Sequence, residues 1–185
     1  NSIIQLNDKP HFLFHRSDTI YLTSYNDQTK TLNIEKKIFS MVPTNSLFIY
    51  DLKIKDSDIF ILASHSTGEF NMVLFRYDMS LDSVSETFIS DEIGFLRNAK
   101  LCLLSSGNYL LTYRVFLSNK PYQILKEIDT IGNIIWRHLH PIPYENVSLS
   151  LIEVDSLNYL IGCGKGRLSS TDPDGEGIPF LMMFN

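Results

Sequence analysis

The sequence predicts an all-β protein, specifically a β-propeller or propeller segment of about four four-stranded blades with a repeat of about 50 residues. Two observations lead to this prediction. Apolar stretches are short, rich in Ile, Val, Tyr, Phe and Thr, and are interrupted by polar turns, while helical periodicity never extends beyond a turn or two. The pattern also recurs at a fixed spacing, which a β-sandwich has no reason to show.

Three segments of the chain align without gaps, and each predicts a β-hairpin. They begin 49 and 50 residues apart, at Leu52, Leu101 and Leu151. Each contains an apolar stretch, a polar turn and a second apolar stretch with an aromatic residue at the same place. The aromatic residues are Phe60, Tyr109 and Tyr159. A fainter copy at residues 13–25 begins only 39 residues before Leu52, so the first unit is expected to be about one strand short.

A second hairpin also repeats, at residues 73–88 and 124–139, where Asp78 and Asp129 correspond. In the later copy Asp129 is expected to end a strand, residues 130–133 to form the turn and residues 134–140 to form the outer strand. Gly132 suits a turn position that needs a positive φ. Trp136, the single tryptophan, is predicted to pack against the next unit, and its N–H needs one partner.

The domain prediction is a single propeller-like domain over residues 1–185. Its units cover approximately residues 10–40, 47–90, 95–140 and 145–185. Residues 178–185 match the third strand of a unit, so the last unit is expected to lack its outer strand. Two alternatives remain open: residues 1–9, with the apolar stretch Ser2–Leu6, supply that strand and close a ring, or further units lie outside this chain.

Composition limits the classes of partner. Sixteen Lys and Arg against twenty-one Asp and Glu give a net charge of −5, and no basic cluster is longer than Lys36-Lys37, so nucleic acid is not expected. No apolar run reaches the length of about 18 residues that a transmembrane helix requires. The chain begins with Asn1 rather than Met, so we expect that an N-terminal piece was removed. Cys102 and Cys163 have no metal-site spacing and are expected to be buried thiols.

A pattern in the second half of the chain resembles a known group of repeats. Asp129-x-x-Gly132-Asn133-x-x-Trp136, followed by a strand beginning Asn158-Tyr159-Leu160, resembles the repeats of bacterial secreted and surface lipoprotein β-propellers, a quinoprotein-like group. Residues 101–163 carry the match, residues 52–88 have Leu81 and Ser85 in place of the Gly and Trp, and residues 1–50 match poorly. The resemblance implies an extracytoplasmic location (periplasmic, cell-surface or secreted) and a binding or scaffolding role.

The same resemblance does not imply quinone chemistry. The Trp motif of quinoprotein dehydrogenases has one more residue between Asp and Trp than this chain has, and the chain has no pair of adjacent cysteines. No cofactor is therefore expected.

The metal ion that the sequence suggests is calcium. Asp172, Asp174 and Glu176 alternate with Pro173 and Gly175 in a long loop, as in Asp-x-Asp-Gly calcium loops. The later bidentate Glu of such loops is missing, and the alternative is a solvated hairpin loop.

Two histidines, His138 and His140, alternate on the predicted outer strand, so their rings are expected to face one side and to be able to share a metal ion. No third ligand is identifiable. The alternative is a pair of solvent-facing residues.

The function expected from these features is that of a non-catalytic, exported binding or interaction domain, with an unknown protein or glycan as its partner. No nucleophile motif is present. A carbohydrate-active propeller, whether it binds or processes glycans, is the first alternative, because carboxylates from distant blades can meet in space. A scaffold segment of a larger surface protein is the second.

Overall fold

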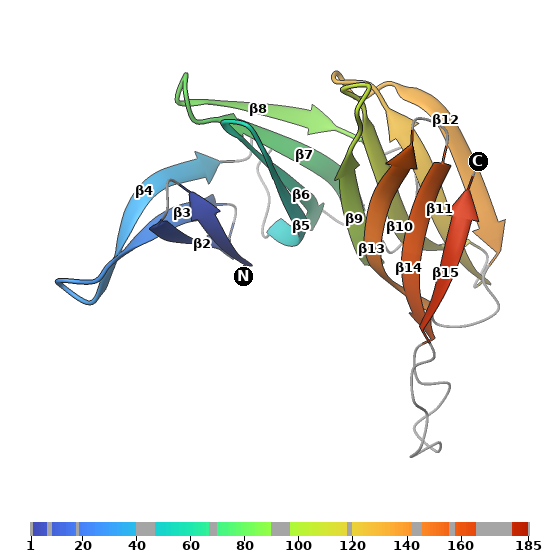
Figure 1. The fold of residues 1–185 in the computed structure, drawn as a ribbon, viewed down its shortest axis with the longest axis horizontal. Coiled ribbons are helices and arrows are strands. Elements are labelled where there is room, and N and C mark those ends of the chain that lie inside the picture. The colour runs from blue at the N-terminus through green and yellow to red at the C-terminus, as the bar shows by residue number, and fades with distance from the viewer. Residues whose placement is uncertain are drawn as a thin grey trace, which may run out of the picture. The chain divides into compact units, whose positions relative to one another are not determined.

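The computed structural model describes residues 2–6, 9–17, 19–39, 47–66, 70–89, 97–117, 120–141, 146–155, 158–165 and 179–184. Within these ranges every regular element is a β-strand, which confirms the all-β prediction (Figure 1). The described residues contain no helix that is long and apolar enough to cross a membrane.

Consecutive strands form four antiparallel sheets in which neighbours in sequence are neighbours in the sheet (Figure 1). Short connections favour this arrangement, because a hairpin pairs adjacent strands with little loss of chain entropy. The first sheet contains β1 (Ser2–Leu6), β2 (Lys9–Arg16), β3 (Thr19–Asn26) and β4 (Thr31–Phe39). The second contains β5 (Leu47–Lys55), β6 (Asp58–Ser66), β7 (Phe70–Asp78) and β8 (Ser83–Phe88).

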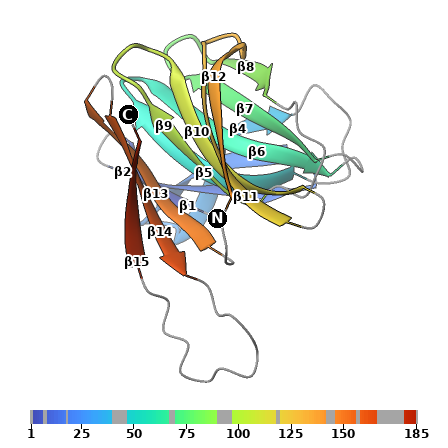
Figure 2. The same ribbon diagram turned by 90° about the vertical axis from the view of Figure 1, so that its right-hand side faces the viewer.

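The third sheet contains β9 (Arg97–Leu103), β10 (Tyr109–Leu117), β11 (Lys120–Ile128) and β12 (Ile134–Pro141). The fourth contains β13 (Asn146–Asp155), β14 (Asn158–Lys165) and β15 (Pro179–Phe184), with β14 in the middle (Figure 2). The predicted third strand of the last unit is thus β15, which pairs with β14.

The hairpins predicted at Leu52, Leu101 and Leu151 are confirmed as β5–β6, β9–β10 and β13–β14. The predicted turn after Asp129 is also confirmed. Gly132 has φ +95° there, in the left-handed region that glycine adopts without the steric cost a Cβ would add.

The first sheet has four strands, so the expectation that the first repeat is about one strand short was wrong. Ser2–Leu6 pairs with β2, from Ser2 opposite Leu13 to Leu6 opposite Lys9. It is therefore a strand of the first sheet, and not the outer strand of the last repeat that one of the two alternatives made it. Residues 13–25 form the second hairpin of their sheet, β2–β3, because alternating apolar residues mark every half-buried hairpin and do not distinguish the first from the second.

The chain divides into two compact units, Asn1–Ser90 and Asp91–Asn185, each containing two of the sheets. In the first unit the two sheets share one apolar core, whose residues alternate along their strands as half-buried strands require. This core contains Leu13, Ile20, Leu22 and Ile38 of the first sheet and Leu47, Ile59, Ile61, Ala63, Val73, Phe75 and Tyr77 of the second.

A polar link also joins the two sheets of the first unit. Lys36 Nζ on β4 lies 2.6 Å from Asp82 Oδ1 in the turn before β8, and the Tyr77 hydroxyl donates to the same oxygen at 2.9 Å. Burial, followed by this hydrogen bond, raises the pKa of Tyr77 to about 12.

The second unit has its own core between the third and fourth sheets. Its buried members are Leu104, Leu110, Leu125, Leu151, Tyr159 and Ile161, and Cys102 and Trp136 pack against them. Ser105 adds a polar link, because its N–H and hydroxyl donate to the two oxygens of Glu153 at 2.8 and 2.9 Å. Half-buried Cys102 packs against this core as a small apolar side chain.

Candidate functional site

The two central strands of the third sheet carry polar side chains in their interior. Thr112 and Arg114 lie on β10 and Gln123 lies on β11, and they are 0%, 3% and 1% exposed. Arg114 is registered opposite Gln123, and Thr112 is two residues from Arg114, so all three are on one face. Burying a guanidinium or an amide costs free energy unless each group finds partners. These three residues, termed the buried polar cluster, form the candidate site.

Hydrogen bonds order part of the buried polar cluster. Gln123 Nε2 donates to Thr112 Oγ1 at 2.5 Å, and Thr112 Oγ1 donates to the carbonyl oxygen of Ile124 at 2.9 Å. The Arg114 guanidinium lies 4.3 Å from the centre of the Phe116 ring, in cation–π range. Gln123 Oε1 has no hydrogen-bond partner within the described residues. The cluster therefore presents one cation and one buried acceptor.

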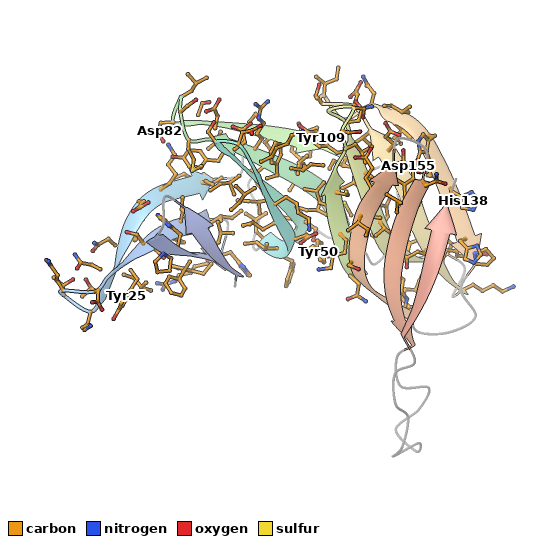
Figure 3. All side chains as sticks on the ribbon, in the orientation of Figure 1. Tyr25, Tyr50, Asp82, Tyr109, His138 and Asp155 are labelled. Carbon is orange, nitrogen blue, oxygen red and sulfur yellow. The ribbon has the colours of Figure 1, made fainter. Side chains whose placement is uncertain are left out.

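Further basic groups share this face of the third sheet. Lys100 is registered opposite Thr112, His140 opposite Gln123 and His138 opposite Leu125. Both histidines lie on the outer strand β12 and are exposed. Figure 3 labels His138 on this strand. The face thus combines a buried cation with basic groups nearer the solvent.

Trp136 lies at the other end of the same face and confirms the packing predicted for it. Its ring packs against Tyr159 of the fourth sheet, with centroids 5.8 Å apart, and its Nε1 donates to Glu127 Oε2 at 2.7 Å. Asn108 Nδ2 donates to Glu127 Oε1, also at 2.7 Å. Burial, followed by the nearby Glu127 carboxylate, raises the pKa of Tyr159. The contacts of Trp136 with Tyr159 and Glu127 therefore hold the third and fourth sheets together, which is a structural role.

Sequence reasoning missed the buried polar cluster and Glu127. A signal for Arg114 exists in the sequence: it lies between Tyr113 and Val115, and apart from Thr112 the other residues of this strand are aliphatic or aromatic on both faces. A strand buried on both faces reads as a continuous apolar run, so a charged residue within it marks a special position.

The histidine pair lies as predicted. The rings of His138 and His140 face the same side, with centroids 6.5 Å apart and planes inclined by 21°. The described part of the chain contains no group of three or more His, Cys, Asp or Glu side chains placed to hold a metal ion. The pair alone is an incomplete zinc site.

The predicted calcium loop, with Asp172, Asp174 and Glu176, lies outside the described residues. Calcium binding there stays a prediction.

The two corresponding aspartates, Asp78 and Asp129, play the same structural role: each carboxylate accepts backbone hydrogen bonds within its turn. Asp78 Oδ1 accepts hydrogen bonds from the N–H groups of Ser80 and Leu81 at 2.9 and 3.1 Å. Asp129 Oδ1 accepts from the N–H groups of Ile131 and Asn133 at 3.0 and 2.8 Å. A carboxylate that closes a turn in this way replaces a backbone acceptor.

These hydrogen bonds also set the charge state of the two carboxyls. The Ser80 hydroxyl, followed by the Leu81 N–H, lowers the pKa of Asp78. Desolvation raises the pKa of Asp129, but hydrogen bonds from Asn133 and from backbone N–H groups more than offset it, so this pKa also lies below its ordinary value.

We expect acid to destabilise the protein partly through these turns. A carboxyl whose folded pKa is lowered contributes stability above its unfolded pKa of about 3.9, and this stability is lost as the pH falls through the folded pKa. Asp129→Asn should therefore show a shallower fall in melting temperature below about pH 4 than the wild type. Ile131→Thr, in the same exposed turn, keeps the carboxylate and should retain the full fall. An equally steep fall in Asp129→Asn would contradict this assignment.

The comparisons with known proteins concern the fold. No family model and no curated protein matches the chain. Among solved structures, it is similar to a protein of unknown function from Dyadobacter fermentans DSM 18053, with a TM-score of 0.57 and 10% identity over 98% of this chain and 52% of that one. The chain thus spans about half the length of that protein.

Proposed function

We propose that the chain is a β-propeller segment of about four blades that serves as a non-catalytic, exported binding domain. The observation that carries the proposal is the buried polar cluster. Thr112, Arg114 and Gln123 occupy interior positions that apolar side chains would fill if stability alone were selected, and Gln123 retains a buried acceptor without a described partner. Such convergent polar groups are typical of ligand sites.

The architectural part of the proposal is supported by the way the sheets are built. Each is a meander of consecutive strands, and in the second unit neighbouring sheets pack face to face through Trp136 and Tyr159. Propeller blades pack in this way. The extracytoplasmic location is supported by the resemblance of residues 101–163 to repeats of exported proteins.

A glycan is the partner that one further observation favours. The first sheet has a face with Phe12, Phe14, Tyr21 and Tyr25, next to Leu32 and Ile34, which are 51% and 53% exposed. Phe14 and Tyr21 stack with centroids 5.0 Å apart and planes inclined by 12°. Half-buried aromatic rings offer broad apolar surfaces of the kind on which sugar rings pack.

The experiment is to measure binding of the labelled chain to an array of neutral and acidic glycans, together with hydrolysis of chromogenic glycosides. We expect binding to a subset of glycans without turnover. Sustained release of chromophore would overturn the non-catalytic assignment. If the first sheet binds neutral glycans, Tyr21→Ala should abolish that binding. Leu81→Ala, which removes a 74% exposed side chain elsewhere in the same unit, should leave it unchanged.

A further inference from the structure

We infer that the open edge of β15 is an interaction surface for a second copy of this chain, and that the two copies pair β15 with β15 in antiparallel orientation. The inference goes beyond the proposed binding function and does not rest on it. A dimer formed in this way carries the aromatic face of the first sheet twice, so it would hold a glycan surface at two points.

The edge of β15 that lies away from β14 is open within the described part of the chain. β15 pairs with β14 along its whole length, from Pro179 opposite Gly164 to Phe184 opposite Tyr159. In the other three sheets the third strand, β3, β7 or β11, has a fourth strand on its other side, whereas β15 ends its sheet (Figure 2). An edge strand presents backbone N–H and C=O groups without ladder partners, which is a template for pairing with another strand.

The sequence of β15 is that of an interior strand. Pro179-Phe-Leu-Met-Met-Phe184 has no charged residue, and five of its residues form a continuous apolar run. β7, the third strand of the second sheet, has a similar run at residues 72–75, which are at most 2% exposed. Such runs are typical of strands that are covered on both faces and paired on both edges. The composition of β15 therefore favours a second neighbouring strand.

Charged residues protect most of the other sheet edges. The four sheets have eight edge strands, of which six contain Lys, Arg, Asp or Glu, such as Lys36 and Lys37 in β4 and Arg137 in β12. A charge on an edge strand opposes pairing, and the same charge from a second copy adds repulsion. The two edge strands without a charge are β1 and β15. Because β1 has only five residues, of which Ser2 and Gln5 are polar, β15 is the edge better suited to self-pairing.

A second copy is the occupant that this edge fits. Two antiparallel strands of identical sequence are related by a two-fold axis, so both copies use the same edge and form the same ladder hydrogen bonds. Since neither copy brings a charge to the contact, no like charges oppose each other. The contact occupies the open edge of β15 in both copies, so association ends at the dimer.

The test is the mass of the 185-residue chain in solution, measured by sedimentation velocity over a range of concentrations. We expect a monomer–dimer equilibrium with a dissociation constant of about 10–100 µM, because a contact between two strands buries less than about 1,200 Å², the low end for specific interfaces.

Two variants of Leu181 probe the contact. Leu181→Lys should weaken dimerisation at least about tenfold, because Leu181 lies in the middle of β15 and the two introduced lysines approach each other across the two-fold axis. Leu181→Glu should weaken it for the same reason. An equal mixture of the two variants should form a dimer again, with one lysine and one glutamate at the contact. This restoration separates repulsion at the edge from a failure to fold, since unfolded chains do not form a defined dimer.

Ile3→Lys is the matched control. It places the same charge on β1, the other edge strand without a charged residue, at a position registered opposite Phe12. Its dimer should dissociate with the same constant as that of the wild type.

Several results would overturn the inference. A monomer at every concentration would do so, and so would oligomers larger than the dimer, which a two-fold contact does not form. An unchanged dimer in Leu181→Lys, or a dimer lost in Ile3→Lys, would move the contact away from β15. If the mixture of Leu181→Lys and Leu181→Glu stays monomeric, two copies of β15 do not face each other. Glycan binding by a strictly monomeric chain would leave the proposed function standing while this inference fails.

Discussion

Trp136→Ala should lower the free energy of unfolding of the second unit by about 3–5 kcal/mol, the range for large aromatic side chains removed from protein cores. The ring packs against Tyr159, and its Nε1 donates to Glu127, which is 9% exposed. Alanine would remove the contact between the third and fourth sheets and leave an oxygen of a largely buried carboxylate without its donor. Losing the contact between the sheets and losing the donor to Glu127 both destabilise the folded state.

The measurement is urea unfolding followed by circular dichroism, since the variant lacks the single tryptophan of the chain. Ile135→Ala is the control, because Ile135 is the neighbouring residue on β12 and is 51% exposed. It should change the free energy of unfolding by less than about 0.5 kcal/mol. The loss of unfolding free energy in Trp136→Phe should lie between those in Trp136→Ala and Ile135→Ala, because phenylalanine keeps an aromatic ring but has no N–H donor for Glu127. If Trp136→Ala lowered the free energy of unfolding by less than about 1 kcal/mol, the contacts of Trp136 would not hold the third and fourth sheets together.

Phe75→Ala should cost a similar amount in the first unit, about 3–5 kcal/mol. Phe75 is 0% exposed on β7 and belongs to the core that the first two sheets share. Removing its ring leaves a cavity among branched aliphatic side chains, which are packed in one arrangement and relax only in part.

Phe39→Ala is the matched control for this variant, since Phe39 is the same residue type, lies in the same unit and is 59% exposed. Unfolding should be followed both by circular dichroism, which reports all the strands, and by the fluorescence of Trp136, which reports the second unit. If the two units unfold independently, Phe75→Ala should shift the first signal and leave the second unchanged. A loss in Phe75→Ala no larger than that in Phe39→Ala would contradict the assigned core.

The hairpins of the second to fourth sheets could be predicted because their determinants are local. Asp129 accepts hydrogen bonds from residues only two and four positions away, and Gly132 adopts its positive φ within the same turn. The packing of Trp136 could also be predicted, since a lone large aromatic side chain on an alternating strand needs an apolar neighbour. Its partner Glu127 was not predicted, because the pairing of β11 with β12 decides which residue faces the indole N–H.

The first strand shows where pattern alone is insufficient. Ser2–Leu6 is apolar enough to pair with either end of the chain, and alternation does not rank the two options. The strand pairs with β2, from which only Asn7 and Asp8 separate it. Closing so short a loop costs much less chain entropy than joining segments nearly the whole chain apart.

By itself, the sequence determined that the protein is all-β, where most of its hairpins lie, and which residues form their turns. These features depend on residues within a few positions of one another. Only the tertiary structure decided that Thr112, Arg114 and Gln123 are buried together. Strand alternation places them on a common face, but it does not say whether that face meets solvent or a neighbouring sheet. Burial is a property of how sheets pack, and it is burial that turns an ordinary arginine and glutamine into a candidate binding site.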